Sequence, residues 1–153
     1  MLIEKKLKEL GISLPVVVPN TSLPLIPGVK TGNLLYCSGR GSDSDPGSAW
    51  KGKLGREYST EEGYVAARWC AVGLLAQAKS VLGDLDRIRR VVKILGMVNC
   101  TPDFEEQPQV INGCSDLFVE LWGEMGRHAR SAVGMGSLPA GIPVEVEIIF
   151  EVD

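Results

Sequence analysis

The chain of 153 residues carries 16 Lys and Arg against 19 Asp and Glu, which gives a net charge of −3 and a pI near 5.3. This weakly acidic balance excludes the basic footprint of a general nucleic-acid binder, and we expect no nucleic-acid partner. The single histidine, His128, excludes a multi-histidine metal site and is the only histidine available to a catalytic triad.

The termini and the cysteines predict a cytoplasmic protein. The first eleven residues interleave charges with leucines and lack the apolar stretch of a signal peptide. The longest uncharged run, 10–29, contains four prolines and cannot be a membrane helix, so no membrane partner is expected. No CxxC pair occurs, which favours buried free thiols over a metal or redox site. The cysteines are Cys37, Cys70, Cys100 and Cys114.

The first half of the chain predicts two helices and one strand. Apolar residues at helical spacing favour a short amphipathic helix that ends at Gly11, followed by a proline-rich extended connection. A strand is expected over 34–38, after the turn signal Gly32-Asn33, and a long loop over 40–53. Ser59 and Glu62 form a capping-box pattern at the start of a helix over 60–82 that Gly83 ends.

The second half predicts three strands and one helix. A β-branched run over 88–100 is expected to be a strand, and Pro108 suits the first turn of a helix that ends near Gly126. Strands are then expected over 131–137 and 144–152, joined by the tight segment LPAGIP. In the last strand, apolar residues from Val144 to Val152 alternate with Glu145, Glu147, Ile149 and Glu151.

This order of elements indicates an α+β or α/β fold in one domain over 1–153, with a helix and extended arm over 1–20. Two main helices are expected on one face of the sheet. The opposite face then needs either solvent or a partner subunit.

A candidate site emerges if the last two strands form a hairpin. A four-residue loop at 139–142 would place Gly136 opposite Glu145, so that Arg130 shares a face with the glutamates and with small residues. An arginine in such a space could clamp a carboxylate, and a glutamate could orient or deprotonate a water. A plain ion pair on a solvated sheet face is the alternative. His128 is interpreted as a capping or surface histidine.

The C-terminal segment RSAVGMGSLPAGIPVEVEIIFEV resembles the RidA/YjgF family of small trimeric enamine/imine deaminases with a chorismate-mutase-like fold. The resemblance extends through VINGCSDLF, the helix over 60–82 and GNLLYCSG, and it covers about residues 25–152. It implies an α+β mixed sheet with two main helices on one face. It also implies a homotrimer with sites in the clefts between subunits, in a longer subgroup of the family.

The resemblance implies a role for six residues of this chain. Arg130 matches the arginine that grips the substrate carboxylate, and Glu145 matches the glutamate that positions the attacking water. The remaining matches line the substrate pocket: Ser38, Gly39, Asn112 and Ala132. Ala132 replaces a cysteine and Leu25 replaces a tyrosine of other members, which should change the shape or polarity of the substrate.

Three functions follow from the resemblance. The first is hydrolytic deamination of small 2-imino or 2-enamino acids, without metal or cofactor. The second is non-catalytic binding of a small carboxylate metabolite by a trimer, which the residues Leu25 and Ala132 motivate. The third is an endoribonuclease, which the acidic charge balance and the lack of a histidine pair oppose.

Overall fold

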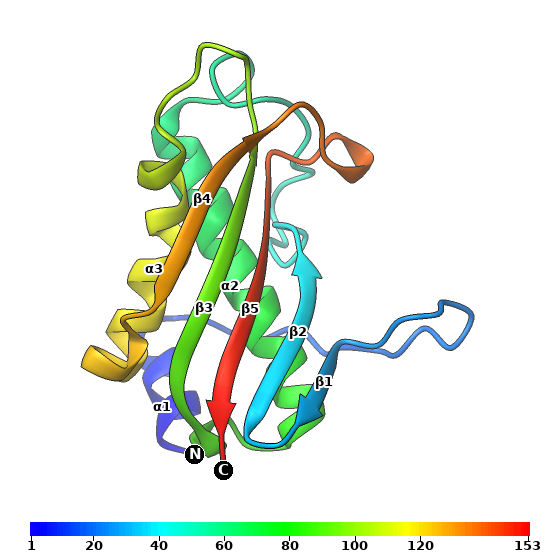
Figure 1. The fold of residues 1–153 in the computed structure, drawn as a ribbon, viewed down its shortest axis with the longest axis vertical. Coiled ribbons are helices and arrows are strands. Elements are labelled where there is room, and N and C mark those ends of the chain that lie inside the picture. Colours follow the sequence, from blue (N-terminus) through cyan, green and yellow to red (C-terminus); the bar gives the residue numbers. More distant parts are fainter.

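A computed structural model describes all residues, Met1–Asp153. One five-stranded sheet with the strand order β1-β2-β5-β3-β4 carries the fold, and the two long helices α2 and α3 cover one of its faces. In Figure 1 both helices lie behind the sheet, and no helix covers the face turned toward the viewer. This is the expected α+β architecture with a mixed sheet.

Three α-helices form where the sequence patterns predict them. α1 spans Leu2–Glu9 and buries Ile3 and Leu7. α2 spans Thr60–Leu82, and its N-terminus has the complete capping box in which the Ser59 side chain accepts from the backbone N–H of Glu62. α3 spans Gln107–Trp122; Gly123, not Gly126, ends it, and a short 3₁₀ turn over Gly123–Gly126 follows. No helix has the length and apolar character needed to cross a membrane.

Four strands agree with the sequence patterns, and a fifth was missed. β2 spans Leu34–Arg40, β3 Ile88–Asn99, β4 Ala129–Met135 and β5 Val144–Val152. The unexpected strand β1, Gly28–Thr31, pairs with β2 across a two-residue turn at Gly32-Asn33. Gly32 has a φ of +56°, a conformation that glycine adopts without steric cost.

The core lies between the sheet and the helices. Residues of β5 from Val144 to Val152 alternate as predicted: Val144, Val146, Ile148, Phe150 and Val152 are buried against the helices. α2 and α3 approach closely at Gly113, where a Cβ would lie 1.9 Å from the carbonyl oxygen of Tyr64. The four cysteines are free and buried in this core.

The predicted hairpin between the last two strands is wrong. β4 pairs with β3 in parallel, while β5 pairs antiparallel with β3 and β2, so that β3 lies between β4 and β5. The connection from β3 to β4 runs through α3, and a crossover of this kind makes the two joined strands parallel neighbours. The segment 138–143 contains a 3₁₀ turn, Pro139–Gly141, in place of a hairpin loop.

The correct pairing moves Arg130 to the other face of the sheet. Arg130 is in register with Ile94, a core residue that is also in register with Ile148. Registered residues point to the same face, so Arg130 is on the helix side and Glu145 on the uncovered side. The face that was predicted to hold both groups does not exist within one chain.

The chain before β1 forms an arm that projects beyond the edge of the sheet (Figure 1). It carries apolar side chains in exposed positions, including Val16, Val18, Leu25 and Ile26. The arm returns to the body at Ser38, whose Oγ donates to the carbonyl of Ile26 at 2.7 Å.

Candidate functional site

The first half of the candidate site is an arginine cluster at the free edge of β4. Arg130 reaches across to α3, where its Nη1 donates to Oδ1 of Asn112 at 2.8 Å and to Oγ of Ser115 at 3.1 Å. Asn112 and Ser115 are three residues apart, so consecutive turns of the helix present both to the guanidinium. No hydrogen bond in the structure uses Nε or Nη2 of Arg130, the edge that suits a bidentate carboxylate.

His128 completes the arginine cluster. Its Nε2 lies 2.9 Å from Oγ of Ser115, and its Nδ1 lies 2.7 Å from the carbonyl oxygen of Gly126. The ring meets Phe118 edge to face, with centroids 6.5 Å apart. Burial lowers the pKa of His128 from its ordinary value, and the positive charge of Arg130 lowers it further. The imidazole is therefore neutral near pH 7. Its bond to the carbonyl of Gly126, the last residue of the 3₁₀ turn, agrees with the interpretation of His128 as a capping residue, but the ring is half-buried and is not a surface group.

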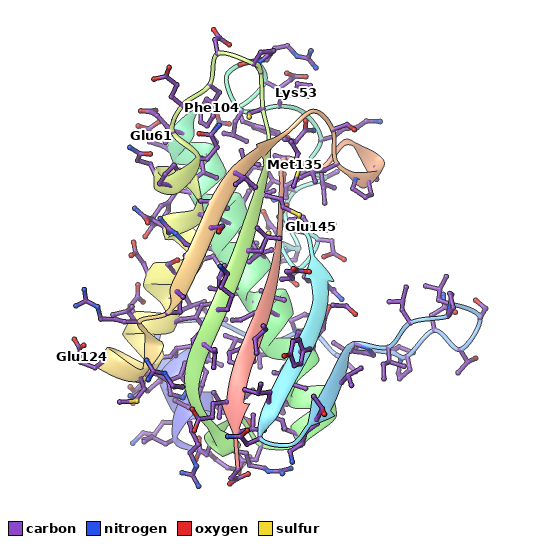
Figure 2. The ribbon with its side chains drawn as sticks, in the orientation of Figure 1. Lys53, Glu61, Phe104, Glu124, Met135 and Glu145 are labelled. Carbon is purple, nitrogen blue, oxygen red and sulfur yellow. The ribbon has the colours of Figure 1, made fainter.

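The second half of the candidate site is a strand-end cluster of Ser38, Gly39 and Glu145. Between the pairs Cys37–Ile148 and Arg40–Val146, β2 advances three residues while β5 advances two. The extra residue makes β2 bulge at Ser38 and Gly39. A Cβ at Gly39 would lie 2.9 Å from Oε2 of Glu145, so the absence of a side chain leaves room for that carboxylate. Figure 2 shows Glu145 on β5 beside the end of β2.

The environment of Glu145 makes its carboxylate more basic than usual. Burial raises the pKa of Glu145, and the charge of Glu147 two residues along the same face adds to the increase. No hydrogen bond or ion pair to the side chain of Glu145 occurs within the chain. A carboxylate with a raised pKa is a better proton acceptor for a bound water.

A cavity of about 740 Å³ lies next to the strand-end cluster. The arm, the end of β2 and the turn before β5 line this open cavity, with both Ser38 and Gly39 among the lining residues. Leu25 from the arm and Gln77 from α2 also line it, and the Gln77 amide donates to the carbonyls of Pro27 and Ser38. The space is mostly apolar at the arm and polar at the strand end.

The structure thus brings the predicted site residues together in two groups. Arg130 and Asn112 contact each other, and Ala132 follows on the same face of β4, packed against the core. Glu145 and Gly39 form the other group with Ser38. Ser115 was not predicted from the sequence, although its spacing of three from Asn112 on a helix could have indicated it.

No group of three or more His, Cys, Asp or Glu side chains is arranged to hold a metal ion. The thiols are also unsuited to reaction, because burial raises the pKa of Cys37 to about 12 and that of Cys114 still more.

Comparisons with known proteins agree with these observations. Residues 4–147 match the family model described as "YjgF/chorismate_mutase-like, putative endoribonuclease". Protein TCP17 of Trypanosoma cruzi is 44% identical over 149 residues, which cover 96% of this chain and 92% of that protein.

Two solved structures illustrate the similarity. A protein of unknown function from Agrobacterium tumefaciens is 46% identical, with 99% of this chain and 93% of that chain covered and a TM-score of 0.91. RidA from an Antarctic Psychrobacter is 27% identical, with 88% and 93% covered and a TM-score of 0.57. The family match, the close relatives and the shared fold lead to one conclusion: this chain belongs to the YjgF/chorismate-mutase-like family, which includes RidA.

Proposed function

We propose that this protein hydrolyses small 2-imino or 2-enamino acids to 2-keto acids and ammonia, as a homotrimer with sites between subunits. The observation that carries the proposal is the geometry of Arg130. Two neutral acceptors, Asn112 and Ser115, hold its Nη1, while its Nε and Nη2 have no partner in the chain. A guanidinium held in this way can bind a planar carboxylate through two parallel hydrogen bonds.

The separation of the two clusters supports a site between subunits. Arg130 lies on the helix side of an edge strand and Glu145 lies on the uncovered side of a central strand. One chain cannot present both groups to one small substrate. In a closed ring of subunits, however, the arginine cluster of one copy meets the strand-end cluster of the next.

The uncovered sheet face supports the same assembly. Tyr36, Ile149 and Leu95 share it, and together with Lys93 and Glu147 they line a second cavity of about 510 Å³. Tyr36 is 45% exposed in the single chain. In the single chain this apolar surface is exposed to water, and a partner subunit would bury it.

In the proposed reaction, Arg130 binds the carboxylate of the 2-imino acid and Glu145 orients a water. Glu145 takes a proton from the water as the water oxygen adds to the imine carbon, and the C=N electron pair moves to nitrogen, which takes up a proton from solvent. The protonated Glu145 then gives its proton to the amine of the resulting carbinolamine. Glu145 next takes the hydroxyl proton as the C=O bond forms and the C–N bond breaks, and it returns that proton to solvent. Ammonia leaves, and holding the reactants in place supplies much of the rate increase.

The direct test measures ammonia released from 2-aminoacrylate that a dehydratase generates in the assay. We expect a wild-type rate above the background of spontaneous hydrolysis, and loss of that excess in Arg130→Ala. Arg127→Ala is the matched control, because Arg127 is a nearby, solvent-exposed arginine that pairs only with Glu124. A wild-type rate equal to the background would refute the deaminase proposal.

A trimer that binds a carboxylate without turnover is the second candidate. It is favoured by the apolar residues Leu25 and Ala132, which provide neither a hydroxyl nor a thiol near the site. Calorimetry with small 2-keto acids distinguishes the two. Binding that depends on Arg130, without turnover of any imine, would support the binding function. RNA cleavage is not proposed, because His128 is the only histidine in the sequence and the net charge of −3 does not favour binding of a polyanion.

A further inference from the structure

The arginine cluster contains a chain of hydrogen bonds that leads away from the proposed substrate position. It runs from the carbonyl of Gly126 through His128 and Ser115 to Arg130. A carbonyl oxygen can only accept, so Nδ1 of His128 must carry the proton. Nε2 of the neutral ring is then an acceptor for the hydroxyl of Ser115. That hydroxyl, having donated, offers its oxygen to Nη1 of Arg130.

Each group in this series of hydrogen bonds has one defined role as donor or acceptor. Because Oγ of Ser115 donates to His128, its lone pairs face the guanidinium, 3.1 Å away. Without the imidazole, the hydroxyl could rotate and point its own proton at the cation. The edge-to-face contact with Phe118 and the bond to Gly126 fix the plane of the ring. The histidine therefore sets the direction of the serine dipole.

The consequence for Arg130 follows from counting its N–H groups. Nη1 has two hydrogens, and the oxygens of Asn112 and Ser115 accept both. Two acceptors on one nitrogen fix the guanidinium plane, whereas one would leave it free to rotate. The edge formed by Nε and Nη2 then points in one direction, with three N–H groups available.

We infer that His128, acting through Ser115, positions Arg130 for the substrate carboxylate. This inference rests on the proposed function, in which Arg130 binds that carboxylate. His128 and Ser115 are positioning residues and not catalytic ones. Ser115 contacts Nη1, the nitrogen outside the free edge of the guanidinium, and the hydrogen bonds of His128 go to Ser115 and to the carbonyl of Gly126. The pair also differs from the Ser–His pair of a nucleophilic enzyme. Here the serine oxygen accepts a hydrogen bond from the Arg130 guanidinium, whereas a nucleophilic serine oxygen must be free to attack the substrate.

The test is a double-mutant cycle on Ser115 and His128. We expect Ser115→Ala and His128→Ala each to raise KM for the imine, and the dissociation constant of 2-oxobutanoate, by about tenfold, with a much smaller effect on kcat. Because His128 acts through Ser115, the double variant should be no worse than Ser115→Ala alone. In the Arg130→Ala background, neither change should alter the remaining binding.

Conservative variants separate this role from a contribution to folding. Ser115→Thr keeps the hydroxyl, and His128→Gln places an amide oxygen where Nε2 accepts; both should recover most of the affinity. Ser80→Ala, a serine on the distant end of α2, is the matched control and should bind like wild type. Circular dichroism and thermal unfolding of each variant show whether it is folded.

The outcomes distinguish this inference from the proposed function. Suppose that the wild type binds the keto acid or turns over the imine in an Arg130-dependent way. The inference alone is then wrong if Ser115→Ala and His128→Ala have wild-type affinity, or if the effects of the two changes on affinity simply add in the double variant. If the wild type neither binds nor turns over, the proposed function fails. Crystal structures of the two alanine variants then decide the positioning role directly, since an unmoved guanidinium would overturn it and a displaced one would support it.

Discussion

Arg130 and Glu145 lie on opposite faces of one sheet, and the whole width of β3 separates their strands. The glutamate has a raised pKa and no partner within its own chain, and the arginine has a free hydrogen-bonding edge. Two groups with complementary chemistry that cannot meet within a chain are what a site shared between subunits requires.

Complementation between two inactive variants tests this arrangement. Arg130→Ala and Glu145→Gln should each be inactive alone, but unfolding and refolding them together in equal amounts should restore activity. If each site takes its arginine from one subunit and its glutamate from the next, about a quarter of the sites in random mixed rings are intact. Ammonia release measures the recovery. A mixture as inactive as the separate variants would contradict a shared site.

Gly39→Ala should lower activity more than stability. The added Cβ would lie 2.9 Å from Oε2 of Glu145, so the end of that flexible side chain must move. A displacement of about 1 Å of a catalytic group can cost on the order of 10²-fold in rate. We expect kcat to fall by about tenfold or more, while the unfolding midpoint changes little. Gly136→Ala is the control, because a Cβ there has no heavy atom within 4 Å.

His128 should make the folded state less stable in mild acid. Its pKa in the folded chain is below the ordinary value of 6.5, so in this pH range the unfolded chain binds more protons than the folded chain. The free energy of unfolding therefore falls as the pH drops from about 6.5 toward the folded pKa, with a slope of at most about 1.4 kcal/mol per pH unit.

Urea denaturation of wild type and His128→Gln at pH 7.5 and 5.5 measures this contribution. The charged group that acts on the ring is Arg130 from β4, whereas Ser115 and Phe118 from α3 and the carbonyl of Gly126 are neutral. The wild type should lose more free energy of unfolding between the two pH values than His128→Gln does. Equal losses would show that His128 titrates normally.

Gly113→Ala should destabilise the fold strongly. A Cβ at Gly113 would lie 1.9 Å from the carbonyl oxygen of Tyr64, where α2 and α3 touch. Backbone cannot give way as a side-chain end can, so the helices must separate, at a cost of about 3 kcal/mol or more. Chemical denaturation measures the change. Gln109→Ala, an exposed position on the same helix, should stay within about 0.5 kcal/mol of wild type; a similarly small effect of Gly113→Ala would contradict the close packing.

Periodicity and capping were enough to locate most of the elements from the sequence. The capping box at Ser59 and the alternation of Val144 to Val152 are local features, and both are present in the structure. β1 was missed because it has only four residues, three of which are exposed, so its sequence lacks the alternation of apolar and polar residues that predicts a strand. The end of α3 was misplaced because Gly123 and Gly126 are equally suitable terminators, and the earlier one applies.

The sequence by itself determined the order of the elements, the family resemblance and the residue types of the candidate site. Only the tertiary structure decided which face each residue occupies. The alternation within one strand shows which of its residues share a face. It does not show which strand lies beside it, and for β4 that neighbour is decided by the crossover through α3. That crossover separates Arg130 from Glu145 and brings Ser115 and His128 to the arginine instead.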